Sequence, residues 1–68
     1  MNQFAAGITY PYAAGQIVKG VVAGTFVVLG SRMIDGEEGY QLKAVNPADH
    51  TQMAPGELWL PADRVKAL

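Results

Sequence analysis

Eight glycines and four prolines divide this chain of 68 residues into short pieces. No piece repeats apolar residues at the i, i+3, i+4 spacing of an amphipathic helix for three turns, so helix is expected to be minor. The pieces are instead rich in Val, Ile, Phe, Tyr and Leu, which favour strands. The sequence therefore predicts a single all-β domain.

Five short strands are expected from this pattern, at residues 16–22, 25–29 or a little further, 40–45, 57–60 and 65–68. Ala23-Gly24 suits a two-residue hairpin turn between the first two strands, because glycine readily adopts a positive φ. Asp35-Gly36 and Gly39 mark a second turn. The alternation of apolar and polar residues is clearest in the third strand.

The segments outside these strands are of three kinds. Residues 62–64, after Pro61, suit one turn of 3₁₀ helix before the last strand. Residues 46–56 show no periodicity and predict a long loop, and long loops in small domains are often functional. Residues 1–15 are expected to form either an edge strand or a loose arm.

Charged side chains are few and scattered. They make up 16% of the residues, with five Lys or Arg against six Asp or Glu, whereas an average domain has about 25%. A chain of this length buries only about 60% of the surface that it exposes when unfolded, and without cysteine no disulfide can support the fold. We therefore expect the chain to associate with itself.

The segment "LWLPADRVKAL" resembles the closing segment of SH3 domains. In that family an apolar strand meets a proline, one 3₁₀ turn follows, and a valine begins the last strand, and residues 61–65 fit this order. The resemblance implies a small five-stranded SH3-like barrel with one 3₁₀ turn before the last strand.

The same resemblance has consequences for peptide binding. Tyr10 and Tyr12 in "TYPYAA" match the aromatic motif near the start of peptide-binding SH3 domains. Arg64, however, stands where that family has an aromatic residue of its groove, and the acidic loop and paired tryptophans of the family are missing from the sequence. Binding of proline-rich peptides is therefore not favoured.

The type II dihydrofolate reductases carried on plasmids are also similar in length and architecture. Like them, the chain has "GYQLKAV", a loop, a strand, a proline and a final short strand. This resemblance would imply a tetramer with a central pore for folate and NADPH. The Val-Gln-Ile-Tyr stretch that lines their pore is replaced at residues 57–60 by Glu-Leu-Trp-Leu, so the enzyme remains an alternative and no cofactor is expected.

The face on which Trp59 lies depends on the register of its strand. If Leu58 and Leu60 point inward, strict alternation places Trp59 outside, where a large aromatic side chain marks an interface. The opposite register buries Trp59 and exposes the two leucines. We expect Trp59 outside, facing another copy of the chain.

Other aromatic residues are candidates for the same role. Phe26 and Val28 lie on one face of the second strand, and Val27 and Leu29 lie on the other, although a small barrel has room for one inward face per strand. Tyr40 could either join a surface patch or fill the end of the barrel. The candidate binding residues are Trp59, Tyr10, Tyr12, Phe26, Tyr40 and Arg64.

No group of residues predicts catalysis or a metal site. His50 is the only histidine and has Asp49 beside it, but the sequence offers no activated nucleophile to accompany them. Asp35, Glu37 and Glu38 cluster near a glycine turn, and their spacing fits no EF-hand. We therefore expect neither a catalytic residue nor a metal ligand.

Nucleic acid and membrane are not favoured as partners. Lys19, Lys43, Arg64 and Lys66 form no basic run, although folding could bring them together. The most apolar segment, residues 20–30, is too short for a bilayer, which needs about 20 residues, and no signal-peptide pattern opens the chain. The expected function is a cytoplasmic protein-interaction module that binds protein, including itself, with the reductase and a nucleic-acid-binding barrel as alternatives.

Overall fold

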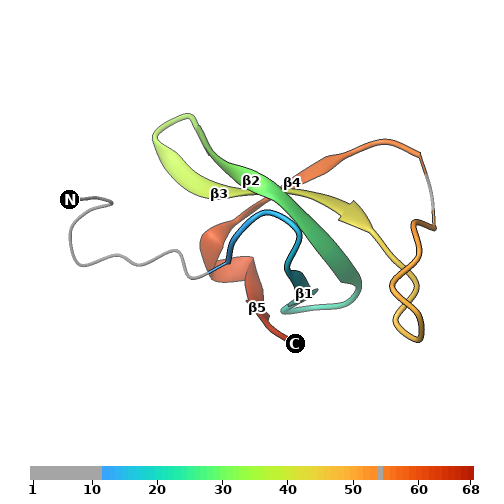
Figure 1. The fold of residues 1–68 in the computed structure, drawn as a ribbon. Coiled ribbons are helices and arrows are strands. Elements are labelled where there is room, and N and C mark those ends of the chain that lie inside the picture. The colour runs from blue at the N-terminus through green and yellow to red at the C-terminus, as the bar shows by residue number, and fades with distance from the viewer. Residues whose placement is uncertain (1–11, 54) are drawn as a thin grey trace.

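A computed structural model describes residues 12–53 and 55–68 and shows five antiparallel strands in one sheet, in the order β4-β3-β2-β1-β5 (Figure 1). The elements are β1 Ile17–Gly20, β2 Thr25–Ile34, β3 Glu37–Ala44, β4 Leu58–Pro61, the 3₁₀ turn η1 Ala62–Arg64, and β5 Val65–Ala67. The prediction of an all-β fold with one 3₁₀ turn before the last strand is confirmed. Within the described ranges the chain has no α-helix, and hence none that could cross a membrane.

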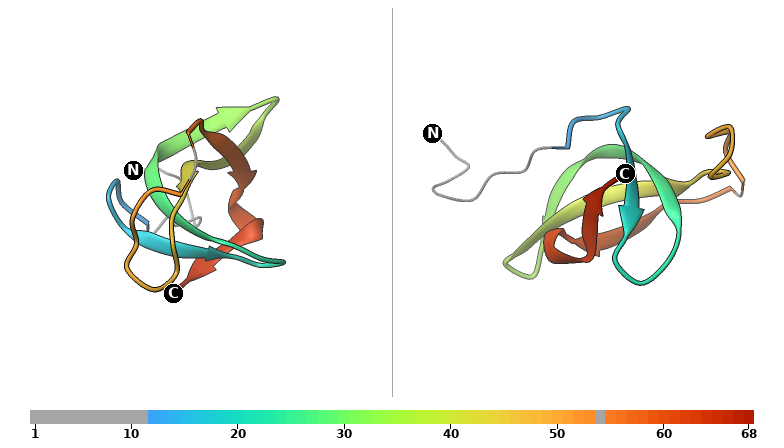
Figure 2. Two further views of the ribbon diagram at one scale, coloured as in Figure 1. Left: turned by 90° about the vertical axis from the view of Figure 1, so that its right-hand side faces the viewer. Right: turned by 90° about the horizontal axis from the view of Figure 1, so that it is seen from below.

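The sheet curls around its own core because β2 is long and bent. The first residues of β2 pair with β1, and β2 pairs with β3 along nearly its whole length. The register shifts between Val28 and Gly30, which leaves Leu29 as an extra residue on β2. A bulge of this kind bends a strand and increases its twist. Figure 2 shows the resulting curvature from two directions.

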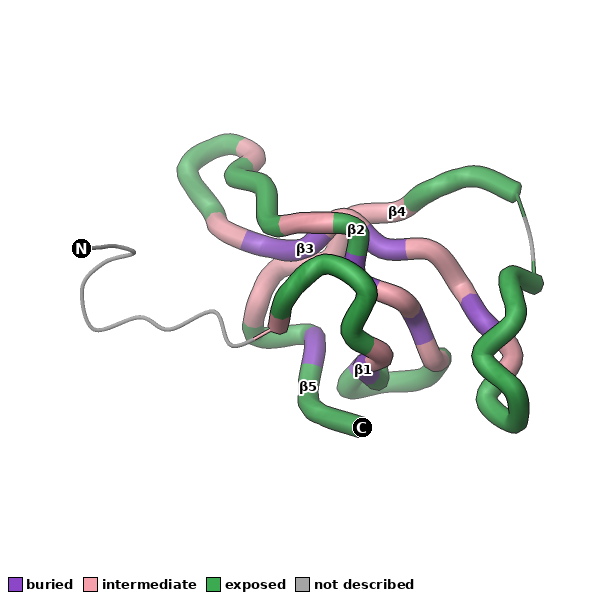
Figure 3. Tube along the Cα trace, viewed as in Figure 1, coloured by how far each residue is buried: buried purple, intermediate pink, exposed green. Residues whose placement is uncertain are grey.

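The core lies inside this curl. One face of each central strand is buried, as the alternating burial along β1 and the first half of β2 shows (Figure 3). The buried cluster consists of Val18, Phe26, Val28, Tyr40, Leu42 and Val65. Tyr12, Ala44, Leu58, Leu60 and Ala62 are partly buried and pack against the cluster. The inward face is thus filled by apolar side chains from all five strands.

The β2–β3 hairpin is longer than the sequence analysis predicted. Ile34 and Glu37 form its last pair, so Asp35 and Gly36 alone make the turn. Their φ angles are 52° and 79°, and positive φ at both positions defines a type I′ turn, whose twist matches that of the strands. Placing Gly39 in the turn was wrong: the two-residue turn lets the strand pairing continue, and Gly39 lies within β3.

The β1–β2 connection also differs from the prediction. β1 ends at Gly20, and the loop comprises the four residues 21–24 rather than a two-residue turn at Ala23-Gly24. The Val21 N–H donates a hydrogen bond to the Arg64 carbonyl oxygen at 2.9 Å, which draws the chain away from β2 and toward η1. Gly24 does have the expected positive φ, 99°.

Residues 1–11, and with them most of the predicted arm or edge strand, lie outside the described part of the chain. Of the remainder, Tyr12 packs against the core cluster. The Gly15 N–H donates to the Val28 carbonyl oxygen, and the Val28 N–H donates to the Gln16 carbonyl oxygen. The chain is therefore attached to β2 just before β1 begins.

Candidate functional site

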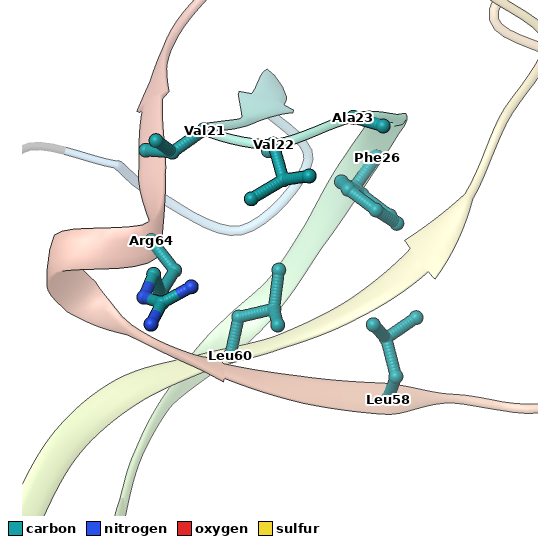
Figure 4. A pocket seen from close by; sticks show the side chains of 8 residues that line it. Val21, Val22, Ala23, Phe26, Leu58, Leu60 and Arg64 are labelled. Atoms are coloured by element: carbon teal, nitrogen blue, oxygen red, sulfur yellow. The ribbon is translucent and has the colours of Figure 1, made fainter.

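An apolar hollow lies between the β1–β2 loop and the strand β4, and it has a volume of about 170 Å³ (Figure 4). Four elements of the fold line the hollow. Its lining residues are Gly20, Val21, Val22 and Ala23 from the end of β1 and the following loop, Phe26 from β2, Leu58 and Leu60 from β4, and Arg64 from η1. Ligand pockets for drug-sized molecules are usually about 300–1,000 Å³, whereas a cavity of about 150 Å³ can hold benzene. The hollow therefore fits one apolar side chain rather than a nucleotide.

The loop presents apolar side chains to solvent next to this hollow. Val22 is 84% exposed and Val21 is 48% exposed. Phe26 is part of the core cluster and also lines the hollow, and Leu58 and Leu60 are half-buried. The hollow thus has exposed valines on one side and a residue of the core cluster on the other. A partner that covered it would remove this apolar surface from water.

Among the described residues that line the hollow, Arg64 alone is charged. Figure 4 places Arg64 at one end of the hollow and Leu58 at the other. The side chain of Arg64 is exposed, and within the described ranges it forms no ion pair. Its backbone carbonyl accepts a hydrogen bond from the Val21 N–H, so the main chain at residue 64 lies beside the apolar loop. This arrangement suits a partner that carries an apolar side chain beside a carboxylate.

Trp59 lies on the opposite, outer face of the sheet. Leu58 and Leu60 pack against the core, so the register is the one that places Trp59 outside. The indole N–H donates to the Arg32 carbonyl oxygen at 3.0 Å. The ring lies against Gly39, where an added Cβ would come within 2.6 Å of two ring atoms. Trp59 is half-buried by these contacts, and its role in an interface stays a prediction.

The aromatic candidates do not gather in one patch. Tyr40 is 1% exposed and fills the core, which is the second of the two alternatives for this residue. Tyr12 packs on Tyr40, with the ring centroids 5.4 Å apart. Phe26 lines the hollow, Trp59 is on the outer face, and Tyr10 lies outside the described residues.

The 46–56 loop begins with an ordered turn. Val45 and Gln52 form an isolated bridge. The Asp49 carboxylate accepts hydrogen bonds from the Thr51 N–H at 3.1 Å and the Thr51 hydroxyl at 2.8 Å. These bonds, the backbone one first, lower the pKa of Asp49 from its ordinary value of 3.8. His50 is exposed and has a φ of 61°. The Asp49 carboxylate is thus engaged by Thr51 and stabilises the turn.

Basic and acidic side chains also have definite places in the fold. Lys19 and Lys66 lie opposite each other on β1 and β5, the Lys43 amino group is 3.5 Å from the Gln52 side-chain oxygen, and Arg64 lines the hollow. Of the five Lys and Arg residues, folding therefore places Lys19 and Lys66 side by side. Across the described ranges, no three His, Asp or Glu side chains are grouped in a way that could hold a metal ion.

Of the residues that line the hollow, only Phe26 and Arg64 are among the binding residues predicted from the sequence. The signal that could have revealed them is "GVVAG", in which two β-branched apolar residues stand between glycines at a predicted turn. Turn residues are usually polar or glycine, so adjacent valines at this position are a signal of an apolar surface site.

The fold and the hollow together describe a small all-β domain with an exposed apolar site. No protein-family model, no curated protein and no solved structure matches this chain.

Proposed function

We propose that this chain is a small protein-interaction module that associates with further copies of itself through the apolar hollow. The observation that carries this proposal is the exposure of Val22, at 84%, beside a hollow lined by Phe26, Leu58 and Leu60. Burial of apolar surface is worth about 25 cal/mol per Å², so covering the hollow and its two valines favours association.

Several features of the fold support such a module. The strand order β4-β3-β2-β1-β5, with a 3₁₀ turn before the last strand, supports an SH3-like barrel. The net charge is only −1, so repulsion between copies is weak. The lack of cysteine is compatible with a cytoplasmic location, which we include in the proposal.

Light scattering after size-exclusion chromatography, over a wide range of protein concentrations, tests self-association. We expect the wild-type chain to form an oligomer and Val22→Lys to shift it toward the monomer. Met53→Lys is the matched control: Met53 is 62% exposed and does not line the hollow, so the same charge there should leave the oligomer intact. A wild-type chain that stays monomeric at all concentrations would contradict the proposal.

A further inference from the structure

The tip of the β2–β3 hairpin carries an exposed apolar side chain among carboxylates. Met33 is 59% exposed and lies directly opposite Glu38 in the register of β2 and β3. Asp35 and Glu37 are at the turn itself. Three of the six acidic residues of the chain thus lie within residues 35–38, around one apolar side chain.

This tip is complementary to the hollow in both size and charge. The hollow has room for one apolar side chain and has Arg64 at its end. Met33 supplies an unbranched side chain that adapts to irregular apolar gaps. Glu38, on the neighbouring strand and opposite Met33, supplies the carboxylate for the guanidinium, and Arg pairs with carboxylates through charge-assisted hydrogen bonds.

The positions of the tip and the hollow allow two copies to exchange these contacts. In both views of Figure 2, the hairpin tip and the loop 21–24 project toward the same side of the molecule, and Figure 1 shows that they lie at opposite ends of that side. A surface that carries both the inserting group and its receptor can pair with itself around a twofold axis, which closes the assembly at two copies.

We infer that the chain forms a twofold dimer in which Met33 of each copy enters the hollow of the other and Glu38 pairs with Arg64. This inference rests on the proposed self-association and names the segment that occupies the hollow. It accounts for the exposure of Val21, Val22 and Met33, which are three of the large hydrophobic side chains that the described chain leaves in water.

A charge exchange tests the pairing. Arg64→Glu places two carboxylates together and Glu38→Arg places two guanidinium groups together, so each variant alone should dimerise at least about tenfold more weakly than the wild type. A mixture of the two variants restores opposite charges at both contacts of a heterodimer. We expect the mixture to recover most of the wild-type affinity, with circular dichroism showing that each variant remains folded.

A disulfide test measures proximity without relying on affinity. The natural chain has no cysteine, so in a mixture of Met33→Cys and Val22→Cys every disulfide joins engineered positions, and the mixed disulfide is measured against the two homodisulfides. We expect oxidation to link Met33→Cys to Val22→Cys far more than Met53→Cys to Val22→Cys, since Met53 is about as exposed as Met33 but does not lie on the hairpin tip.

The outcomes separate the two proposals. If Val22→Lys abolishes the dimer but Met33→Lys does not, and the mixed variants neither recover affinity nor cross-link, the hollow is an interface for a different segment and this inference is overturned. If no variant changes the oligomer, or no oligomer forms, the proposed function fails as well.

Discussion

The indole N–H of Trp59 on β4 donates a hydrogen bond to the backbone carbonyl of Arg32 on β2, at 3.0 Å. The two residues are separated by β3, whose Gly39 pairs with Arg32 and leaves room for the ring. One side chain therefore ties an edge strand of the sheet to the strand two positions away. This link lies one residue pair from Met33, in the hairpin that we propose as the inserting segment.

Trp59→Phe should lower the free energy of unfolding by about 1 kcal/mol, because it removes the hydrogen bond and keeps a ring over Gly39. Urea unfolding followed by far-ultraviolet circular dichroism measures the change, at one fixed low protein concentration. Tyr12→Phe is the control, because it removes a hydroxyl from another half-buried aromatic residue, and within the described ranges that hydroxyl forms no hydrogen bond. An unchanged midpoint for Trp59→Phe would show that the bond to Arg32 contributes nothing.

Gly39→Ala should destabilise the fold by about 1–3 kcal/mol, the usual cost of inserting a group where no space exists. The added Cβ would meet the Leu60 carbonyl oxygen and the Trp59 ring, both well inside contact distance. Gly30→Ala is a matched control in the neighbouring strand, since its Cβ would meet nothing within 4 Å. Thermal unfolding of both variants measures the loss of stability. An equal loss in the two variants would contradict the conclusion that Gly39 leaves space for the Trp59 ring.

Gly36→Ala should cost about 1 kcal/mol, because alanine is strained at the φ of 79° that the type I′ turn requires. Gly36→Asn should cost less, since asparagine tolerates this conformation. Chemical unfolding of the two variants gives the comparison. If alanine and asparagine were equally tolerated, the turn would not depend on the positive φ.

The Asp49 turn should respond to acid. The hydrogen bonds from Thr51 lower the pKa of Asp49 below 3.8 in the folded chain. The carboxylate therefore stabilises the turn at pH values above 3.8, and this contribution is lost as the pH falls through the lowered pKa. The amide resonance of Thr51, followed by NMR against pH, should titrate with a midpoint below 3.8.

Thr51→Val gives the matched test of that cause. It removes the hydroxyl and keeps the backbone N–H, so the titration midpoint should move up toward 3.8 without reaching it. A midpoint in the natural chain at or above 3.8 would show that the hydrogen bonds do not favour the charged form.

Local sequence signals predicted the elements of the fold because each signal acts over a few residues. The glycine and proline spacing, the alternation around Leu42 and the Pro61 boundary led to the strands and to η1. The hairpin ends were less accurate. The prediction that Gly39 lies in a turn was wrong because glycine is common in turns. The space that Gly39 leaves for the ring of Trp59 depends on another strand, and neighbouring residues in the sequence do not indicate it.

The site was harder to predict because it depends on contacts between distant segments. Arg64 was noticed through a family resemblance, yet its place beside Val22 follows from the hydrogen bond between its carbonyl and Val21. Tyr40 and Phe26 are aromatic, and aromatic residues are common at interfaces, but the curl of the sheet places both in the core cluster. Only the three-dimensional arrangement distinguishes an aromatic side chain that is buried in the core from one that is exposed on the surface.

The pairing of β5 with β1 affects how the chain can fold during its synthesis. Gly20 lies opposite Val65, with nearly all of the other strands between them in the sequence. The β2–β3 hairpin can close as soon as its own residues are free, whereas contacts between distant residues form more slowly. On a ribosome, β1 would therefore keep one edge unpaired until Val65 emerges, after the residues of all the other strands.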